Sequence, residues 1–217
     1  MEGHIDSGVA FIFEGETEQV FYEALFYYFN GKNRNYLLSQ KFDEKINEVI
    51  YYSQSSFRNI IIRTKTIGTI TQIANTAQWF KNSCIKQYEN IKWTIFLCYD
   101  TDSYKEDITM FYEDDWKNLR RKLRSPYIEV IDLAASSMIE DLFLLDYAGI
   151  CNYLKIETQL IPKAGNGKQT LKNFFRRNGK IYHEGERSSD FILSLNLETI
   201  INKSNLNLQS IGKNLFP

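Results

Sequence analysis

The chain has 217 residues, with 26 lysine and arginine residues against 27 aspartate and glutamate residues, and a net charge of −1. A charge this close to zero excludes a strong global attraction to nucleic acid, so such binding would need local basic patches. Hydrophobic residues make up 43% of the chain and aromatic residues 15%, which is enough for a sizeable core and excludes wholesale disorder.

Few residues are suited to disulfide or zinc chemistry. The three cysteines include no CxxC pair, and the two histidines form no HExxH motif. No apolar run approaches the roughly 20 residues that span a bilayer. We therefore expect a protein of the reducing cytoplasm that does not bind membranes.

The N-terminal part of the chain predicts strands that alternate with helices. Residues 9–13 are continuously apolar, which is typical of a strand buried on both faces of a parallel sheet. A helix follows, with Thr17 as its predicted N-cap. A second strand is predicted at residues 59–63, and apolar positions at helical spacing predict a helix over residues 70–88. Residues 32–56 show no clear pattern.

The alternation continues along the middle of the chain. Residues 93–99 form the strongest predicted strand, and helical spacing follows over residues 108–123. Another strand is predicted at residues 127–133, and a helix begins after Ser137. Strands that alternate with helices of this length favour an α/β fold with a mostly parallel sheet.

The alternation fades after about residue 150. We therefore predict one α/β domain over residues 1–150 and a helical C-terminal extension over residues 151–217 that packs on it. Within the extension, residues 163–168 are predicted to form a loop, which is followed by two short helices near residues 169–178 and 188–202.

Acidic residues follow two of the predicted strands directly. Glu14 comes after the first strand, and Asp100 and Asp102 come after the strongest one. The carboxyl ends of parallel strands meet at one edge of a sheet, so we expect these carboxylates to share a cleft. Their repulsion calls for a cation, and oxygen ligands without histidine or thiolate favour Mg²⁺ or Mn²⁺.

Three segments in this order resemble the Toprim fold. Residues 11–18, Phe-Ile-Phe-Glu-Gly-Glu-Thr-Glu, are similar to its first strand and glutamate turn, and residues 98–102, Cys-Tyr-Asp-Thr-Asp, are similar to its Asp-x-Asp strand. Residues 135–142, Ala-Ser-Ser-Met-Ile-Glu-Asp-Leu, resemble the acidic helix of Toprim domains in the OLD and RloB-like groups. The resemblance covers roughly residues 8–150.

The resemblance implies a metal-dependent nuclease site. By position, Glu14, Asp100, Asp102 and Glu140 would be its catalytic carboxylates and would bind Mg²⁺ or Mn²⁺, with Asp141 as the alternate to Glu140. Glu14 would also be the proton-transfer group. The implied activity is the hydrolysis of phosphodiester bonds in DNA or RNA by an activated water.

A lysine and two basic clusters complete the predicted site. OLD-like nucleases carry a lysine after the acidic helix, and either Lys163 or Lys168 in the Gly-rich loop could match it as a catalytic residue. The residues predicted to bind the nucleic-acid backbone are basic and lie in two predicted helices: Arg120, Arg121, Lys172, Arg176 and Arg177.

The leading hypothesis is a small, stand-alone Toprim-type nuclease, for which the resemblance implies a role in bacterial anti-phage defence or RNA processing. Two alternatives stay open: a receiver-like domain that uses Mg²⁺ for phosphoryl transfer, and a non-catalytic Toprim subunit or sensor of a defence complex. An ATPase or another defence protein is a possible partner, and a homodimer is also considered.

Overall fold

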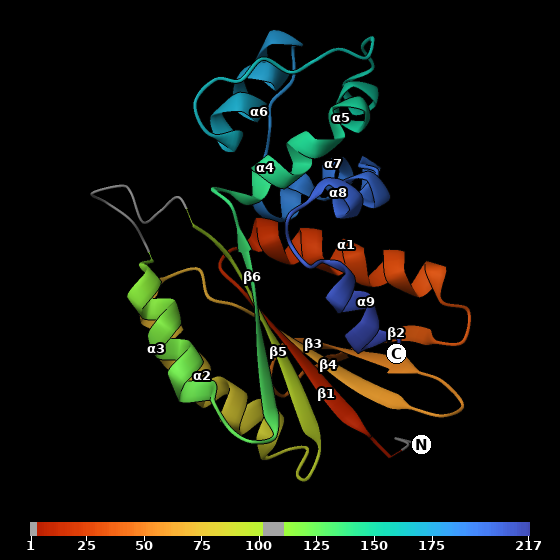
Figure 1. Ribbon diagram of the computed structural model, residues 1–217, viewed down its shortest axis with the longest axis vertical. Helices are drawn as coiled ribbons and strands as arrows, with labels where there is room; N and C mark the ends of the chain where they lie inside the picture. The colour runs from red at the N-terminus through yellow and green to blue at the C-terminus, as the bar shows by residue number, and fades with distance from the viewer. Residues whose placement is uncertain (1–3, 102–110) are drawn as a thin grey trace.

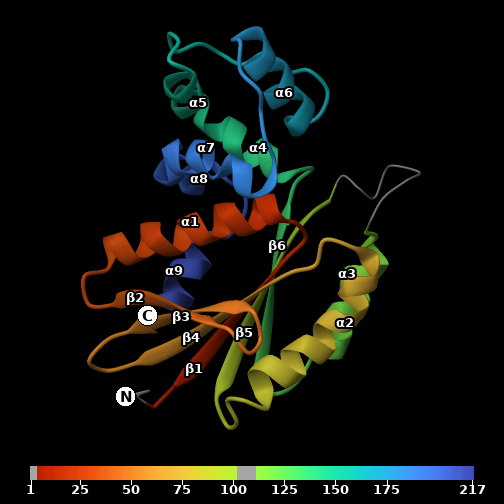
Figure 2. The same cartoon turned by 180° about the vertical axis from the view of Figure 1, so that it is seen from behind.

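A twisted sheet with helices on both faces forms the centre of the molecule (Figures 1 and 2). The computed structural model describes residues 4–101 and 111–217, so the predictions for Asp102 and for the start of the helix at residue 108 lie outside it. Within these residues the sheet has six strands: β1 (Ser7–Phe13), β2 (Leu37–Asp43), β3 (Glu48–Gln54), β4 (Asn59–Thr66), β5 (Lys92–Asp100) and β6 (Ile128–Ala135).

The strand order is β2-β3-β4-β1-β5-β6. Strands β4, β1, β5 and β6 are parallel, and β3 and β2 continue the sheet in antiparallel fashion. The prediction of an α/β fold with a mostly parallel sheet is confirmed. The unassigned residues 32–56 form the hairpin of β2 and β3, and β2 lies at the sheet edge with most of its side chains exposed or half-buried, so it lacks a clean apolar alternation.

The helices form layers on both faces of the sheet. Figure 1 shows α2 and α3 against one face, α1 and α9 against the other, and α4 to α8 stacked beyond α1. None of the helices in the described residues is long and apolar enough to cross a membrane. The helical elements are α1 (Glu16–Lys32), α2 (Ile70–Phe80), the π-helical η1 (Lys81–Ile85), α3 (Glu113–Leu123), α4 (Ile139–Phe143), η3 (Leu144–Asp146), α5 (Tyr147–Leu154), α6 (Gly167–Arg177), η4 (Gly185–Ser188), α7 (Ser189–Ser194), α8 (Leu197–Lys203) and α9 (Gln209–Leu215).

Alternation along the central strands divides the core into two halves. Phe11 and Phe13 of β1 point toward the α1 side together with Phe96 of β5, whereas Ile12 and Leu97 point toward α2 and α3. All seven residues of β1 are buried, which confirms the prediction of a strand covered on both faces.

The C-terminal helices share the core on the α1 side. Apolar residues of α6 to α9 belong to the same buried cluster as the phenylalanines of β1. Helix α9 is also tied to the sheet by hydrogen bonds, because Ser53 Oγ donates to the carbonyl oxygen of Leu215 and the side chains of Thr94 and Asn214 are bonded at 3.0 Å.

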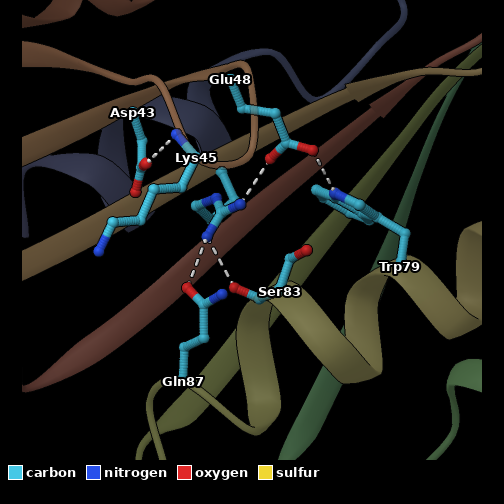
Figure 3. A network of polar contacts seen from close by, with 7 residues as sticks. Asp43, Lys45, Glu48, Trp79, Ser83 and Gln87 are labelled. Atoms are coloured by element: carbon cyan, nitrogen blue, oxygen red, sulfur yellow. Dashed lines mark hydrogen bonds and ion pairs between the residues drawn. The ribbon is translucent and has the colours of Figure 1, made fainter.

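A buried arginine joins the sheet to the helical layer on the α2 side (Figure 3). The side chain of Arg63 in β4 has no solvent exposure, and its guanidinium bonds the Glu48 carboxylate at 2.5 Å and the Ser83 carbonyl oxygen at 2.7 Å. The indole N–H of Trp79 donates to the second oxygen of Glu48. The network therefore fixes β3, β4 and the α2–η1 helix to one another.

Gly8, the second residue of β1, is packed so closely that its position has no room for a side chain. A Cβ atom at Gly8 would lie 2.5 Å from the ring of Trp93. We expect Gly8→Ala to destabilise the protein by roughly 1–3 kcal/mol, because the buried ring has to shift. Chemical denaturation of this variant beside Gly31→Ala tests the claim, since a Cβ at Gly31 in α1 meets nothing within 4 Å. An equal effect of the two substitutions would contradict it.

Candidate active site

A pocket of about 430 Å³ opens where β1 and β5 end. Its walls come from the loop after β1, the start of α1, the end of β4 and the turn after it, the end of β5, the start of α4, the start of α6 and the segment before η4. The ionisable residues that line it are Glu14, Glu16, Glu18, Asp100, Glu140, Lys168 and Glu184.

Glu14 and Asp100 meet in this pocket, as their positions after neighbouring parallel strands predict. The backbone N–H of Asp100 donates to the Glu14 carboxylate at 3.1 Å, and the N–H of Glu14 donates to the carbonyl oxygen of Cys98. The neighbouring ends of β5 and β6 are joined by Thr101, whose hydroxyl donates to the carbonyl of Ala135 at 2.9 Å. Two acids 86 residues apart are thus held on one rigid sheet edge.

Glu18 is the most perturbed acid of the pocket. It lies in the first turn of α1, whose N-cap is Gly15 rather than the predicted Thr17. Its side chain is only 6% exposed, and burial raises its pKa to about 8, helped by the charges of Glu14 and Glu140 and opposed by backbone N–H groups of Gly15 and Glu18. Glu18 is therefore largely protonated at neutral pH.

Glu140 lies beside it at the start of α4 and is also buried. Burial raises its pKa, whereas its own backbone N–H, a hydrogen bond from Tyr182 and the charge of Lys168 oppose the rise. The hydroxyl of Tyr182 donates to Glu140 Oε1 at 3.1 Å. Two buried glutamates with different partners thus face one cavity, which is the arrangement that separates acid and base roles.

Lys168, from the first turn of α6, brings positive charge to the pocket. Its ammonium group lies 2.5 Å from the Glu184 carboxylate, which also pairs with Lys172 at 2.7 Å. Burial lowers the pKa of Lys168, but Glu184, Glu140 and Asp100 together raise it above its ordinary value. Lys168 therefore stays charged and offsets part of the negative charge around it.

Two other predicted site residues lie outside the pocket. Asp141 accepts a hydrogen bond from the backbone N–H of Met138 at 3.2 Å, so it closes the first turn of α4. Lys163 is exposed, and its charge acts on Asp141 rather than on the pocket. The sequence left open the choice between Glu140 and Asp141 and the choice between Lys163 and Lys168. Glu140 and Lys168 are the members of these pairs that line the pocket.

The predicted nucleic-acid contacts lie on α3 and α6, and most of them have protein partners. Arg120 pairs with Glu113 and Asp132, and Lys172 pairs with Glu184. Arg121 bonds Asn118, Arg176 bonds Asn173, and Arg177 is exposed near the end of α6. Binding of nucleic acid by these residues, like the predicted partner proteins and homodimer, stays a prediction.

The predicted Mg²⁺ or Mn²⁺ site is wrong. Among the described residues, which leave out Asp102, no group of three or more histidine, cysteine, aspartate or glutamate residues is arranged to hold a metal ion. The expected repulsion between carboxylates is relieved in other ways, because Glu18 is largely protonated and Lys168 supplies a positive charge. The carboxylates among the described residues thus do not form a site for a divalent cation.

Comparison with known proteins identifies no family. No family model matches the chain, and no curated protein matches it. Solved structures that match include the 5′-methylthioadenosine/S-adenosyl homocysteine nucleosidase of Campylobacter jejuni, at 11% identity over 95% of this chain and 99% of that chain, with a TM-score of 0.30. The futalosine hydrolase of Helicobacter pylori matches at 9% identity over 97% of this chain and 99% of that chain, also with a TM-score of 0.30.

The predicted Toprim-type nuclease is wrong. No family model supports the resemblance, and the described residues form no group that could hold the metal ion on which such a nuclease depends. The role in anti-phage defence, which rested on that resemblance, is withdrawn with it. The likeness to the solved structures is itself too slight to transfer their activity, so the function has to be argued from the pocket.

The sequence did not predict three residues in or beside the pocket as site residues: Glu18, Tyr182 and Glu184. Glu18 had a usable signal, because an acid at the third position of a helix commonly reaches back to the N-cap. Tyr182 and Glu184 precede η4 in the C-terminal part and follow no strand, so no local pattern connected them to residues 14 and 100.

Proposed function

We propose that this protein is a hydrolase that cleaves glycosidic bonds, with Glu18 as general acid and Glu140 as general base. The observation that carries the proposal is the pair of buried glutamates in one pocket, of which Glu18 has a pKa of about 8. An acid that is protonated at neutral pH beside a second carboxyl group is the arrangement that glycoside hydrolysis requires.

In the proposed reaction, Glu18 donates its proton to the leaving group while Glu140 takes a proton from water. The water oxygen forms a bond to the sugar carbon as the bond to the leaving group breaks, so the products are the free sugar and the protonated leaving group. A proton passes from Glu140 back to Glu18 to restore the starting state. The charge of Glu14 supports this cycle because it helps to keep Glu18 protonated.

The charges of the pocket limit the substrate class. Six carboxyl groups line it against one lysine, and that lysine is paired with Glu184. Such a pocket repels phosphates and other anions and favours neutral or cationic molecules. Carboxylates also accept hydrogen bonds from hydroxyl groups, so a sugar is the substrate class that we favour.

The proposed activity is tested by the release of reducing sugar from nucleosides, which carry C–N glycosidic bonds, and from disaccharides, which carry C–O bonds. We expect the wild-type protein to cleave one of these classes between pH 5 and 8, the range in which Glu18 holds its proton. A general acid and a general base each contribute about 10²–10⁴-fold to the rate, so Glu18→Gln and Glu140→Gln should each reduce kcat by about 10²-fold or more.

Glu44→Gln is the matched control, because Glu44 is an exposed residue between β2 and β3 and lies outside the pocket. It should leave kcat unchanged. If the wild-type protein releases no sugar from either class over this pH range, the proposed function is wrong.

A further inference from the structure

The segment at residues 182–185 contacts three separate parts of the pocket. The hydroxyl of Tyr182 donates to Glu140 Oε1 at 3.1 Å, and the carboxylate of Glu184 pairs with Lys168. The backbone N–H of Gly185 donates to Thr17 Oγ at 2.9 Å, in the first turn of α1. A short stretch of chain thus connects α4, α6 and α1 where their first turns surround the cavity.

Tyr182 itself is firmly held. Its ring is 5% exposed and packs edge-on against Phe175 and Phe191, with ring centroids 5.5 and 5.9 Å away. Both phenylalanines are buried in the core on the α1 side. The hydroxyl group therefore has little freedom to move away from Glu140.

We propose that Tyr182 is a positioning residue, whose hydroxyl group holds the Glu140 carboxylate in the orientation in which it acts on substrate. This inference rests on the proposed function for the role of Glu140, but the contact that it concerns is independent of any substrate. A buried carboxylate that accepts a hydrogen bond from a fixed hydroxyl keeps one rotamer, which is what a proton-accepting group needs.

Four charged or titratable groups face Glu140 from the surrounding elements. Tyr182 and Glu184 come from the segment before η4, Lys168 from α6, and Glu18 from α1. Tyr182 and Lys168 favour the ionised form of Glu140, whereas Glu184 disfavours it. Removal of the tyrosine hydroxyl should therefore make Glu140 harder to ionise, and removal of the Glu184 charge should make it easier.

The test follows the side-chain carboxyl ¹³C signal of Glu140 in the full-length protein as pH is varied. The signal is assigned by its loss in Glu140→Gln. In Tyr182→Phe we expect the titration midpoint of Glu140 to rise by roughly one pH unit, the usual order for one lost hydrogen bond to a carboxylate. In Glu184→Gln the midpoint should instead fall.

Tyr36→Phe is the matched control, because its hydroxyl bonds the carbonyl oxygen of Pro217 far from the pocket and its loss should leave Glu140 unchanged. An unchanged midpoint in a folded Tyr182→Phe protein overturns the inference. If Tyr182→Phe does not fold, a midpoint that fails to fall in Glu184→Gln overturns the electrostatic arrangement on which it depends. Sugar release is measured separately, so a protein that shows these shifts without hydrolysis disproves the proposed function and leaves the contact established.

Discussion

The free energy of unfolding of the wild-type protein should fall with rising pH by about 4 kcal/mol more than that of Glu18→Gln, over the range from about pH 4 to pH 8.5. Burial raises the pKa of Glu18 from 4.5 in the unfolded chain to about 8 in the folded protein, so folding binds a proton between these values. The stabilisation of the folded protein by the proton on Glu18 is complete below the pKa of this group in the unfolded chain, and it is lost as pH rises through its pKa in the folded protein. Glutamine resembles the protonated acid and does not titrate.

Urea denaturation at intervals of pH measures this difference directly. Glu44→Gln is again the control and should follow the wild-type curve, because Glu44 is exposed between β2 and β3. Parallel curves for wild type and Glu18→Gln would show that Glu18 is ionised in the folded protein, and Glu18 could then not act as the general acid.

Arg63→Met should lower the free energy of unfolding by roughly 3–5 kcal/mol, which is the usual cost of removing one partner of a buried ion pair. The arginine side chain is fully buried, and the Glu48 side chain is only 21% exposed. The substitution leaves the Glu48 carboxylate with the Trp79 indole as its neutral partner and leaves the Ser83 carbonyl without the guanidinium donor. Chemical denaturation at neutral pH measures the loss.

Arg120→Met serves as the comparison for a partly buried arginine whose acidic partners are more exposed. Arg120 pairs with Glu113 and Asp132, whose side chains are 53% and 37% exposed, so its loss should cost about 1 kcal/mol or less. Equal losses in the two variants would contradict the view that the Arg63 network, shown in Figure 3, fixes β3 and β4 to the α2–η1 helix.

The central strands could be predicted because burial on both faces leaves a plain apolar signal. Residues 9–13 lie within β1 and residues 93–99 lie within β5, as predicted. The β2–β3 hairpin could not be predicted in the same way, since edge residues such as Leu37 and Phe42 are more than half exposed. Buried and exposed side chains do not alternate along β2, so its sequence shows neither the two-residue period of a half-buried strand nor the period of a helix.

The site was predictable where the sheet itself brings residues together. Glu14 and Asp100 were placed correctly because parallel neighbours end at the same edge. The chemistry was not predictable from those positions, because a cluster of acids suggests a cation unless the pKa of each acid is known. Protonation of Glu18 depends on its burial, and that burial arises from tertiary packing rather than from local sequence.

The hydrogen bonds that tie α9 to the sheet have a consequence for synthesis on the ribosome. Phe11 and Phe96 stack in the core half that α9 and its neighbouring helices cover. A nascent chain that has emerged only as far as β6 has α1 on these rings, since Phe26 packs 4.6 Å from Phe11, but it lacks the apolar residues of α6 to α9 that complete this half of the core. Chaperones that recognise incompletely covered apolar surfaces should engage this polypeptide until α9 has left the exit tunnel.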